Sequence, residues 1–392
     1  MGKINKIGYS LKDVAVVQAP ISYQLHRGDV YPFNNTCNRE TYPIFVAPMA
    51  AVTDEMNYKT WIENKVTPIV PRSVQGRLSI DERLKISNET FVSFSLSEVE
   101  ILFEEDRFRK VDDDDNDVFY ICIDIAHGTL SALYRICHQI KTKYWDRVVI
   151  MTGNIANPNA YLDYCRAGID YVRCSVGTGS RCTSSCAVSI HYPMATLLDE
   201  INAIRKNMNI AELSTVYGIF KETKVIADGG IGWYDDIQKA LVLGADYVMI
   251  GKLFAECEEA CGEVGWATSM ESFAKGDYLD NKGMKRLTKD YDDYGGLFIA
   301  NTENHPSEFK QYRMYSGMSH RSMQKITGGD GKKVSEGICK PVEVKYSVKQ
   351  WITNMDSYLR SCMTYTDSFT LDDLKKAEVI ILGGSGDSVY RK

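Results

Sequence analysis

Short apolar runs recur along the chain from residue 44 onward, and segments with helical periodicity separate them. The runs are rich in β-branched residues, are as long as a buried strand, and mostly end in a glycine, a proline or a polar turn. They are Ile44–Met49, Val66–Arg72, Thr90–Leu96, Val118–Ile125, Arg147–Gly153, Tyr171–Gly177, Lys224–Gly230 and Tyr247–Leu253. Helical patterns between them include Leu130–Lys143, Ala160–Ala167, Ala195–Lys206 and Trp233–Leu243, with Gly244 as a stop for the last helix.

Strands that alternate with helices in this way predict an α/β fold, and eight such strands indicate a (β/α)8 TIM barrel. An open doubly wound sheet is the alternative, but the number of runs and their even spacing favour the closed barrel. We therefore expect a single catalytic barrel domain over residues 1–392. Its core would span about residues 44–256, a flap and insertion about 257–340, and a C-terminal segment 341–392.

Three segments do not follow this alternation of strand and helix patterns. Residues 1–43 are polar and irregular, with one apolar run at Val14–Val17. The acidic run from Asp112 to Asp115, with Asp117 beyond it, precedes the fourth strand and predicts a solvated loop on the inactive face. The stretch from Glu258 to Lys340 is long and polar, and it follows the eighth strand, so it predicts a lid or binding element on the active face.

Composition excludes several classes of protein. With 44% hydrophobic and 25% charged residues and a net charge of -6, the chain has the make-up of a soluble globular protein and no surplus of cations for nucleic acid. We expect no membrane span and no signal peptide, because no apolar stretch is long enough. The eleven cysteines include no Cys-x-x-Cys pair, which argues against a zinc knot or a disulfide framework and fits a reducing cytoplasm.

Candidate chemistry gathers where the strands end, which is the catalytic side of a barrel. The sixth strand leads into Gly177-Thr178-Gly179-Ser180-Arg181-Cys182-Thr183-Ser184. Glycines permit tight backbone turns, so this loop could hold an anion on its N–H groups and present a thiol beside it. Alternatively, the cysteine is a small apolar filler, as most buried cysteines are.

Two neighbouring strand ends add a candidate phosphate site. The seventh ends in Asp228-Gly229-Gly230, and the eighth in Ile250-Gly251-Lys252. Barrels commonly build phosphate sites from the loops after these two strands. Asp228 suits a ribose diol, whereas the alternative for Asp-Gly-Gly is an ordinary turn. At the end of the fourth strand, Asp124 lies among apolar residues, where an unpaired carboxylate would be costly, so a functional role is favoured.

These motifs together resemble the IMP dehydrogenase/GMP reductase family. The similarity runs from about Ile44 to Thr366. Its motifs are Gly177 to Thr183, Ala227-Asp228-Gly229-Gly230, Met249-Ile250-Gly251 and Tyr315-Ser316-Gly317-Met318. Family dehydrogenases commonly insert a CBS pair after the second strand, and the short connection from Arg72 to Thr90 has no room for one.

The resemblance implies a set of site residues. Cys182 would be the nucleophile that forms a thioimidate at C2 of a purine nucleotide, assisted by Thr183, Ser184 and Glu336. The implied substrate-binding residues are Ser180, Asp228, Gly229, Gly230, Gly251, Lys252, Tyr315, Gly317 and Met318, and the implied cofactor-binding residues are Arg72, Asp124, Ala126 and Arg173. The resemblance also allows a monovalent cation such as K+ on the carbonyls of Gly177, Gly179 and Cys182. It further implies a homotetramer that binds GMP and IMP, whereas the composition predicts a cytoplasmic protein that binds neither nucleic acid nor membrane.

Within the family, the motifs favour the GMP reductase branch, with NADPH-dependent reductive deamination of GMP to IMP and ammonia. No Arg-Tyr pair lies between Met318 and Glu336, and Asp124-Ile125-Ala126-His127-Gly128 is similar to the reductase pattern. Two departures stand against it. Ser184 occupies the position of a reductase threonine, and Arg72 that of a reductase lysine, which could surrender a proton. The alternatives are NAD-dependent oxidation of IMP to XMP by an IMP dehydrogenase and a divergent enzyme for a modified purine nucleotide.

Overall fold

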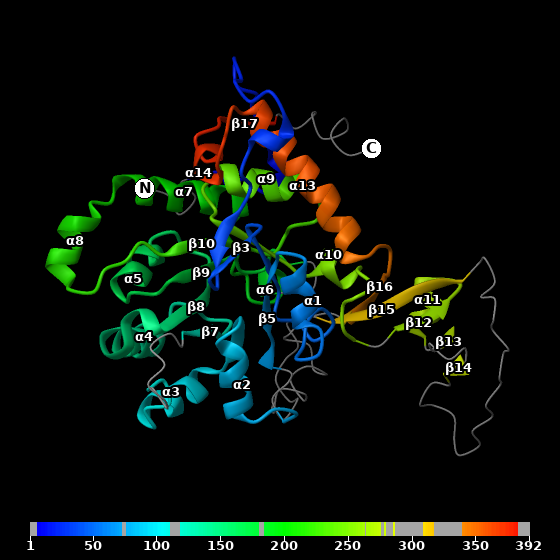
Figure 1. Cartoon of the computed structure of the whole chain (residues 1–392), viewed down its shortest axis with the longest axis horizontal. Coiled ribbons are helices and arrows are strands. Elements are labelled where there is room, and N and C mark those ends of the chain that lie inside the picture. Colours follow the sequence, from blue (N-terminus) through cyan, green and yellow to red (C-terminus); the bar gives the residue numbers. More distant parts are fainter. Residues whose placement is uncertain are drawn as a thin grey trace.

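A closed barrel of eight parallel strands forms the centre of the molecule, which confirms the (β/α)8 prediction (Figure 1). The computed structural model describes residues 6–72, 76–109, 118–179, 184–262, 264–275, 278–279, 285–286, 309–316 and 339–382. The barrel strands are β4 (Ile44–Val46), β5 (Thr67–Val70), β6 (Phe91–Phe94), β7 (Phe119–Asp124), β8 (Val148–Ile155), β9 (Tyr171–Cys174), β10 (Lys224–Asp228) and β11 (Tyr247–Ile250). Each lies within or overlaps one predicted run. Neighbours in the sequence are neighbours in the barrel, and β11 pairs with β4 to close it.

The strands are predominantly apolar because both of their faces are buried along most of their length. In β4, Phe45 points into the barrel, whereas Ile44 and Val46 belong to the layer between strands and helices. The interior is filled by large side chains, and the Phe45 ring meets Phe91 and Tyr171 edge-on at centroid distances of 5.5 and 5.7 Å. The barrel is therefore a packed core, and the chemistry must lie at its end.

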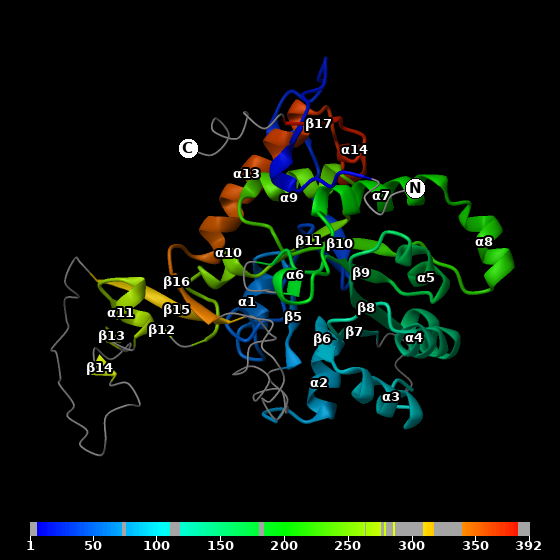
Figure 2. The ribbon, with the colours of Figure 1, turned by 180° about the vertical axis from the view of Figure 1, so that it is seen from behind.

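Helices cover the outside of the barrel (Figures 1 and 2). They are α1 (Tyr58–Glu63), α2 (Ile80–Ser87), α3 (Leu96–Glu104), α4 (Ser131–Tyr144), α5 (Ala160–Arg166), α7 (Met194–Asn207), α8 (Ile210–Tyr217), α9 (Tyr234–Val242) and α10 (Lys252–Ala255). The four predicted helical patterns correspond to α4, α5, α7 and α9. A four-residue helix, α6 (Ser184–Ala187), follows the loop after β9. The segment between β5 and β6 contains α2, in agreement with the expected lack of a CBS insertion.

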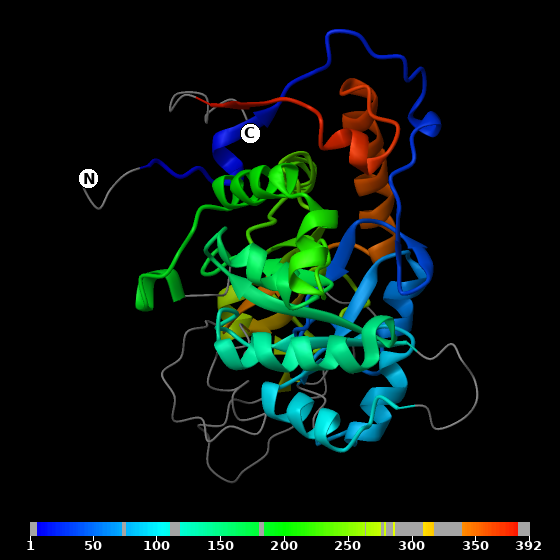
Figure 3. The ribbon, with the colours of Figure 1, turned by 90° about the vertical axis from the view of Figure 1, so that its left-hand side faces the viewer.

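The two ends of the described chain meet on one side of the barrel (Figure 3). The strand β1 (Val14–Val16) pairs antiparallel with β17 (Val379–Ile381). Alongside them lie the turn η1 (Leu11–Asp13), the long helix α13 (Val348–Tyr365) and the short helix α14 (Leu371–Leu374). The predicted loose end at residues 384–386 lies outside the described residues, as does the acidic run 112–117.

The prediction that residues 1–43 are irregular is wrong in one respect. They contain a hairpin, β2 (Asn34–Thr36) with β3 (Arg39–Thr41), and the turn η2 (Arg27–Asp29). The hydroxyls of Thr36 and Tyr247 are 3.0 Å apart, so the hairpin packs at the start of β11, opposite the ends that carry the glycine loops. Strands of three residues are too short to show a sequence period, which is why the pattern missed them.

The stretch after the eighth barrel strand also has more structure than the expected loop. It contributes a five-stranded sheet in the order β14 (Lys285–Arg286), β13 (Tyr278–Leu279), β12 (Val264–Ala267), β15 (Lys310–Ser316) and β16 (Cys339–Glu343). This sheet and the helix α11 (Met270–Ala274) project from the barrel on the side opposite α8 (Figures 1 and 2). None of the helices in the described part of the chain is both long and apolar enough to cross a membrane.

Candidate active site

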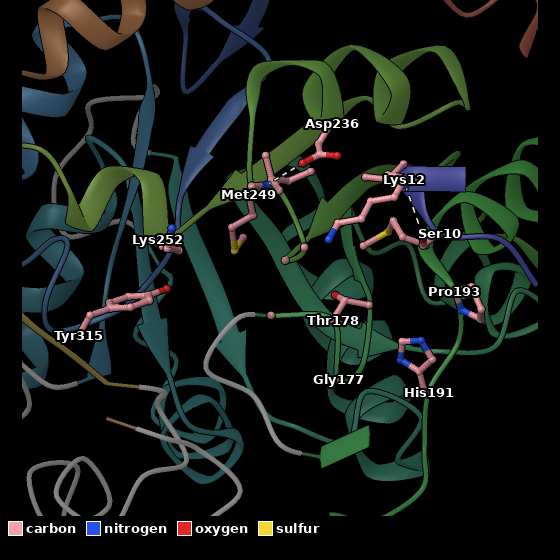
Figure 4. Close-up of a pocket in the computed structure, with 18 residues that line it drawn as sticks. Ser10, Lys12, Gly177, Thr178, His191, Pro193, Asp236, Met249, Lys252 and Tyr315 are labelled. Atoms are coloured by element: carbon pink, nitrogen blue, oxygen red, sulfur yellow. Dashed lines mark hydrogen bonds between the residues drawn. The ribbon is translucent and has the colours of Figure 1, made fainter. Parts of the chain in front are cut away.

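A cavity of about 490 Å³ opens where β9, β10 and β11 end (Figure 4). Its walls come from the three strand ends and from two segments distant in sequence, the η1 turn and strand β15. Its lining residues are Ser10, Leu11, Lys12, Gly177, Thr178, Gly179, His191, Pro193, Met194, Gly229, Gly230, Ile231, Gly232, Asp236, Met249, Gly251, Lys252 and Tyr315. The structure therefore brings together the glycine loops after the sixth, seventh and eighth barrel strands.

Glycine is required at two points of this cavity for different physical reasons. Gly229 has φ +90°, a conformation that side chains strain, and a Cβ there would lie 3.1 Å from the backbone nitrogen of Gly179. A Cβ on Gly251 would come within 2.6 Å of the Tyr315 hydroxyl and 3.0 Å of the Met49 sulfur. Larger residues would fill the space between these loops, so the glycines keep open a recess lined by backbone.

A chain of charged side chains crosses the neighbouring strand ends. The Arg173 guanidinium donates through Nη1 to Asp124 Oδ1 and through Nε to Asp228 Oδ2, both at 2.9 Å. Asn154 Nδ2 donates to the same Asp228 oxygen at 2.6 Å. Arg72 Nε lies 3.4 Å from Asp124 Oδ2. Residues on β7, β8, β9 and β10, together with Arg72 just after β5, are thus joined into one network.

Burial and charge oppose each other in this network. The side chains of Arg173 and both aspartates are only 11% and 14% exposed. Burial alone would raise the pKa of Asp124, but the positive charges of Arg173 and Arg72 hold that pKa below its ordinary value. Burial likewise works to lower the pKa of Arg173, yet Asp228 and Asp124 raise it well above its ordinary value. Asp124 and Arg173 are therefore held in their charged forms.

The loop after β9 is fixed from both sides up to Gly179. The hydroxyls of Ser175 and Thr178 form a hydrogen bond, and Thr178 Oγ1 also donates to the Asp228 carbonyl at 3.4 Å. Ser185 Oγ donates to the Gly177 carbonyl at 3.3 Å. Gly179 is the last described residue before Cys182, and it lines the cavity.

Two further predicted binding residues lie at the cavity with partners of their own. The Tyr315 side chain is buried, and its hydroxyl donates to Met49 Sδ at 3.2 Å. Lys252 lines the cavity, but its Nζ pairs with Glu256 Oε1 at 2.9 Å.

Ala126 is exposed, two residues beyond Asp124. Among the predicted residues, Ser180, Cys182, Thr183, Gly317, Met318 and Glu336 lie outside the described part of the chain, as does the side chain of Ser184.

The residues present fit a polar cofactor beside Asp124. The Arg72 Nε is buried and has no hydrogen-bond partner among the described residues, although Asp124 is near it. An orphaned donor of this kind suits an amide or hydroxyl oxygen of a bound group. For metals, the described residues contain no cluster of three or more His, Cys, Asp or Glu side chains. The suggested K+ site at Gly177, Gly179 and Cys182 stays a prediction, because Cys182 is not described.

Sequence reasoning missed four residues of this region. Asn154 belongs to β8 at the catalytic end of the barrel, so its position at a strand end was an available signal. Ser10, Lys12 and His191 line the cavity from segments outside the barrel strands. The local pattern of apolar and polar residues does not show which distant segments of the chain meet in the fold.

The fold and the cavity define a (β/α)8 barrel with a glycine-lined binding site at the carboxyl ends of its strands. The model of the IMP dehydrogenase/GMP reductase domain matches residues 99–280. Similar curated proteins carry the name inosine-5'-monophosphate dehydrogenase. The protein of Chlorobaculum parvum is 27% identical over 321 residues, 82% of this chain and 53% of its own length. Those of Haemophilus influenzae and Escherichia coli K12 are each 30% identical over 68% of this chain and 46% of their own length.

The chain belongs to the IMP dehydrogenase/GMP reductase family. It spans about half the length of the curated relatives that it matches. The relatives named here are dehydrogenases, so the expected preference for the reductase branch is not confirmed.

Proposed function

We propose that this protein is an oxidoreductase that acts on a purine nucleoside 5'-monophosphate with a nicotinamide dinucleotide. One observation carries the proposal: the glycine-lined cavity adjoins a carboxylate, Asp228, that Arg173 and Asn154 fix in place. The backbone recess suits a phosphate, and a fixed carboxylate suits a ribose. The family membership supplies the purine base.

The hydrogen bonds that Asp228 already makes leave one of its carboxylate oxygens available for a ribose hydroxyl. Both bonds from Arg173 and Asn154 reach Oδ2, and no described residue donates a hydrogen bond to Oδ1. An ionised carboxylate only accepts hydrogen bonds, and a ribose hydroxyl is a donor. Oδ1 is therefore available to the ribose, and the phosphate would lie toward Gly229, Gly230 and Gly251.

Cys182 is proposed as the nucleophile. Its sulfur would add to C2 of the purine, and the covalent bond would break again when product leaves. The loop that carries it begins at Gly177 to Gly179 in the cavity wall, which brings the chain toward the nucleotide before the cysteine. Thr183 or Ser184 and Glu336 would move the proton that the reaction requires.

A bound nicotinamide dinucleotide would accept or supply the hydride at C2. Arg72, Asp124, Ala126 and Arg173 are the residues proposed to hold it. Asp124 is kept ionised by two arginines, so it can accept hydrogen bonds from the cofactor's carboxamide or ribose.

Two reactions fit this site, and they differ in direction. Oxidation of IMP to XMP with NAD is the first, because the similar curated proteins are IMP dehydrogenases. Reduction of GMP to IMP and ammonia with NADPH is the second. It is supported by Asp124-Ile125-Ala126-His127-Gly128 and by the lack of an Arg-Tyr pair between Met318 and Glu336.

Paired assays at the nicotinamide absorbance band separate the two reactions. With IMP and NAD, the dehydrogenase proposal predicts a rise in absorbance. With GMP and NADPH, the reductase proposal predicts a fall and the release of ammonia. Cys182→Ala should abolish turnover in whichever assay is active, while IMP binding by calorimetry persists. If neither pair reacts, or if Cys182→Ala turns over like the parent, the proposed function is wrong.

A further inference from the structure

One wall of the cavity comes from the N-terminal segment, outside the barrel core. Lys12 lines the cavity together with its neighbours Ser10 and Leu11. Figure 4 shows its side chain extended from the η1 turn into the cavity on the side of Thr178, whereas Lys252 and Tyr315 lie across from it. Lys12 thus brings an ammonium group to the recess predicted to hold a phosphate.

The backbone that carries Lys12 is held firmly. Asp13 Oδ2 accepts from the backbone N–H and the hydroxyl of Ser10, at 2.6 and 2.7 Å, which closes the turn. Leu11 is buried, and β1 begins at Val14 and pairs with β17. On the other side of the turn, Tyr9 N–H donates to Thr196 Oγ1 at 2.7 Å. Only the side chain of Lys12 must be ordered when a ligand binds, so the entropic cost is small.

The Lys12 ammonium is not engaged by a carboxylate in the described chain. The other lysine of the cavity, Lys252, pairs with Glu256. The cavity's carboxylate is Asp236, whose Oδ2 accepts from the backbone N–H groups of Gly232 and Trp233 at 2.8 and 3.1 Å. No ion pair joins Lys12 to any described acidic residue, and its side chain is exposed to the cavity and solvent.

A phosphomonoester carries a charge of about -1.5 to -2 near pH 7. Backbone N–H groups orient it but do not neutralise it, and the other lysine that lines the cavity, Lys252, is already compensated by Glu256. We infer that Lys12 binds the 5'-phosphate of the nucleotide and that this contact makes the cavity prefer a phosphorylated nucleotide to its nucleoside. The inference rests on the proposed function, because it takes a nucleoside 5'-monophosphate as the ligand.

Calorimetry with IMP and with inosine, which lacks the phosphate, tests this inference in the whole chain. The Lys12→Gln substitution should weaken IMP binding by about tenfold or more, the effect of losing one charge-assisted hydrogen bond. Inosine binding should change by less than about twofold. The Lys12→Arg variant keeps the charge and should recover most of the affinity for IMP.

Lys6→Gln is the matched control. Lys6 belongs to the same segment, but its Nζ pairs with Glu200 at 2.8 Å, and it does not line the cavity. Its removal should leave IMP affinity unchanged. If the parent binds IMP and Lys12→Gln binds it equally well, the inference is wrong and the proposed function stands. If the parent binds neither IMP nor GMP, the proposed function fails, and the inference falls with it.

Discussion

Arg173 is the residue on which the charges of the site depend. It bridges Asp124 on β7 and Asp228 on β10, two largely buried carboxylates whose other partners in the described chain are Arg72 and Asn154. Removing one member of a buried ion pair costs more than the pair contributes, because the remaining charge stays desolvated. Arg173 is therefore expected to matter for both stability and ligand binding.

Replacing Arg173 by glutamine should lower the stability at neutral pH by about 3–5 kcal/mol. The loss should shrink on acidification. A carboxyl with a depressed pKa stabilises the fold above its unfolded pKa, about 3.9, and that stabilisation is lost as pH falls below it. In the variant, only Arg72 opposes the burial that raises the pKa of Asp124, so Asp124 should become protonated at a higher pH than in the parent. Urea unfolding at a series of pH values measures the difference.

Arg166→Gln serves as the control for this substitution. Arg166 pairs with Asp163 at 2.9 Å, and the two side chains are 41% and 53% exposed, so the change should stay within about 1 kcal/mol. An Arg173→Gln variant as stable as the parent across the pH range would contradict the network's importance.

At the residue scale, the sequence predicted the carboxylates of the site better than it predicted the side chains that pair with them. Asp124 was identified because a lone carboxylate in an apolar strand is costly, and the structure supplies Arg72 and Arg173 beside it. Asn154 was missed because its contact with Asp228 joins residues that are 74 positions apart. Such contacts depend on how the strand ends meet around the barrel, which periodicity does not encode.

At the scale of elements, β15 connects the projecting sheet to the cavity. Arg313, which is 1% exposed, donates through Nη1 to the carbonyls of Ala255 and Cys257, both at 2.7 Å, and through Nη2 to that of Glu258 at 3.2 Å. Burial lowers the pKa of Arg313 from its ordinary value. Tyr315 follows two residues later on the same strand, so the arginine fixes the strand that carries it.

An Arg313→Met variant should lose at least about 2 kcal/mol of stability, because it leaves buried carbonyls without a donor. It should also raise the KM for the nucleotide more than it lowers kcat, because Tyr315 is displaced from the cavity. Thermal unfolding and steady-state kinetics measure the two effects.

Lys310→Met provides the comparison on the same strand. Lys310 is exposed and pairs with Glu343 at 3.0 Å, so its loss should change neither quantity appreciably. Equal effects of the two substitutions would show that Arg313 has no special function in holding β15.

The elements differ in how well the sequence predicts them. The barrel strands are visible because both faces are buried and their residues are apolar and β-branched. The strands of the projecting sheet are two to seven residues long, and charged residues interrupt several of them, so the stretch after β11 was expected to be a loop. Their pairing joins segments as far apart in the sequence as β12 and β15, and a local sequence pattern cannot predict such a pairing.

At the scale of the whole molecule, the barrel fixes where chemistry can occur. Residues from the loops after β9, β10 and β11 meet only because the strands are parallel and closed in this order. The N-terminal segment reaches the same cavity because β1 pairs with β17 near the end of the chain. The order of the strands followed from the sequence, whereas the approach of the N-terminal segment did not.

The central proposal is that a purine nucleotide in this cavity is attacked by Cys182. Acid quenching during turnover, followed by mass measurement of the peptide that contains Cys182, tests it most directly. With IMP and NAD, or with GMP and NADPH, the account predicts one nucleotide attached to Cys182 in the parent and in the control Cys186→Ser, and none in Cys182→Ala. Attachment to another cysteine, or turnover by Cys182→Ala, would contradict it.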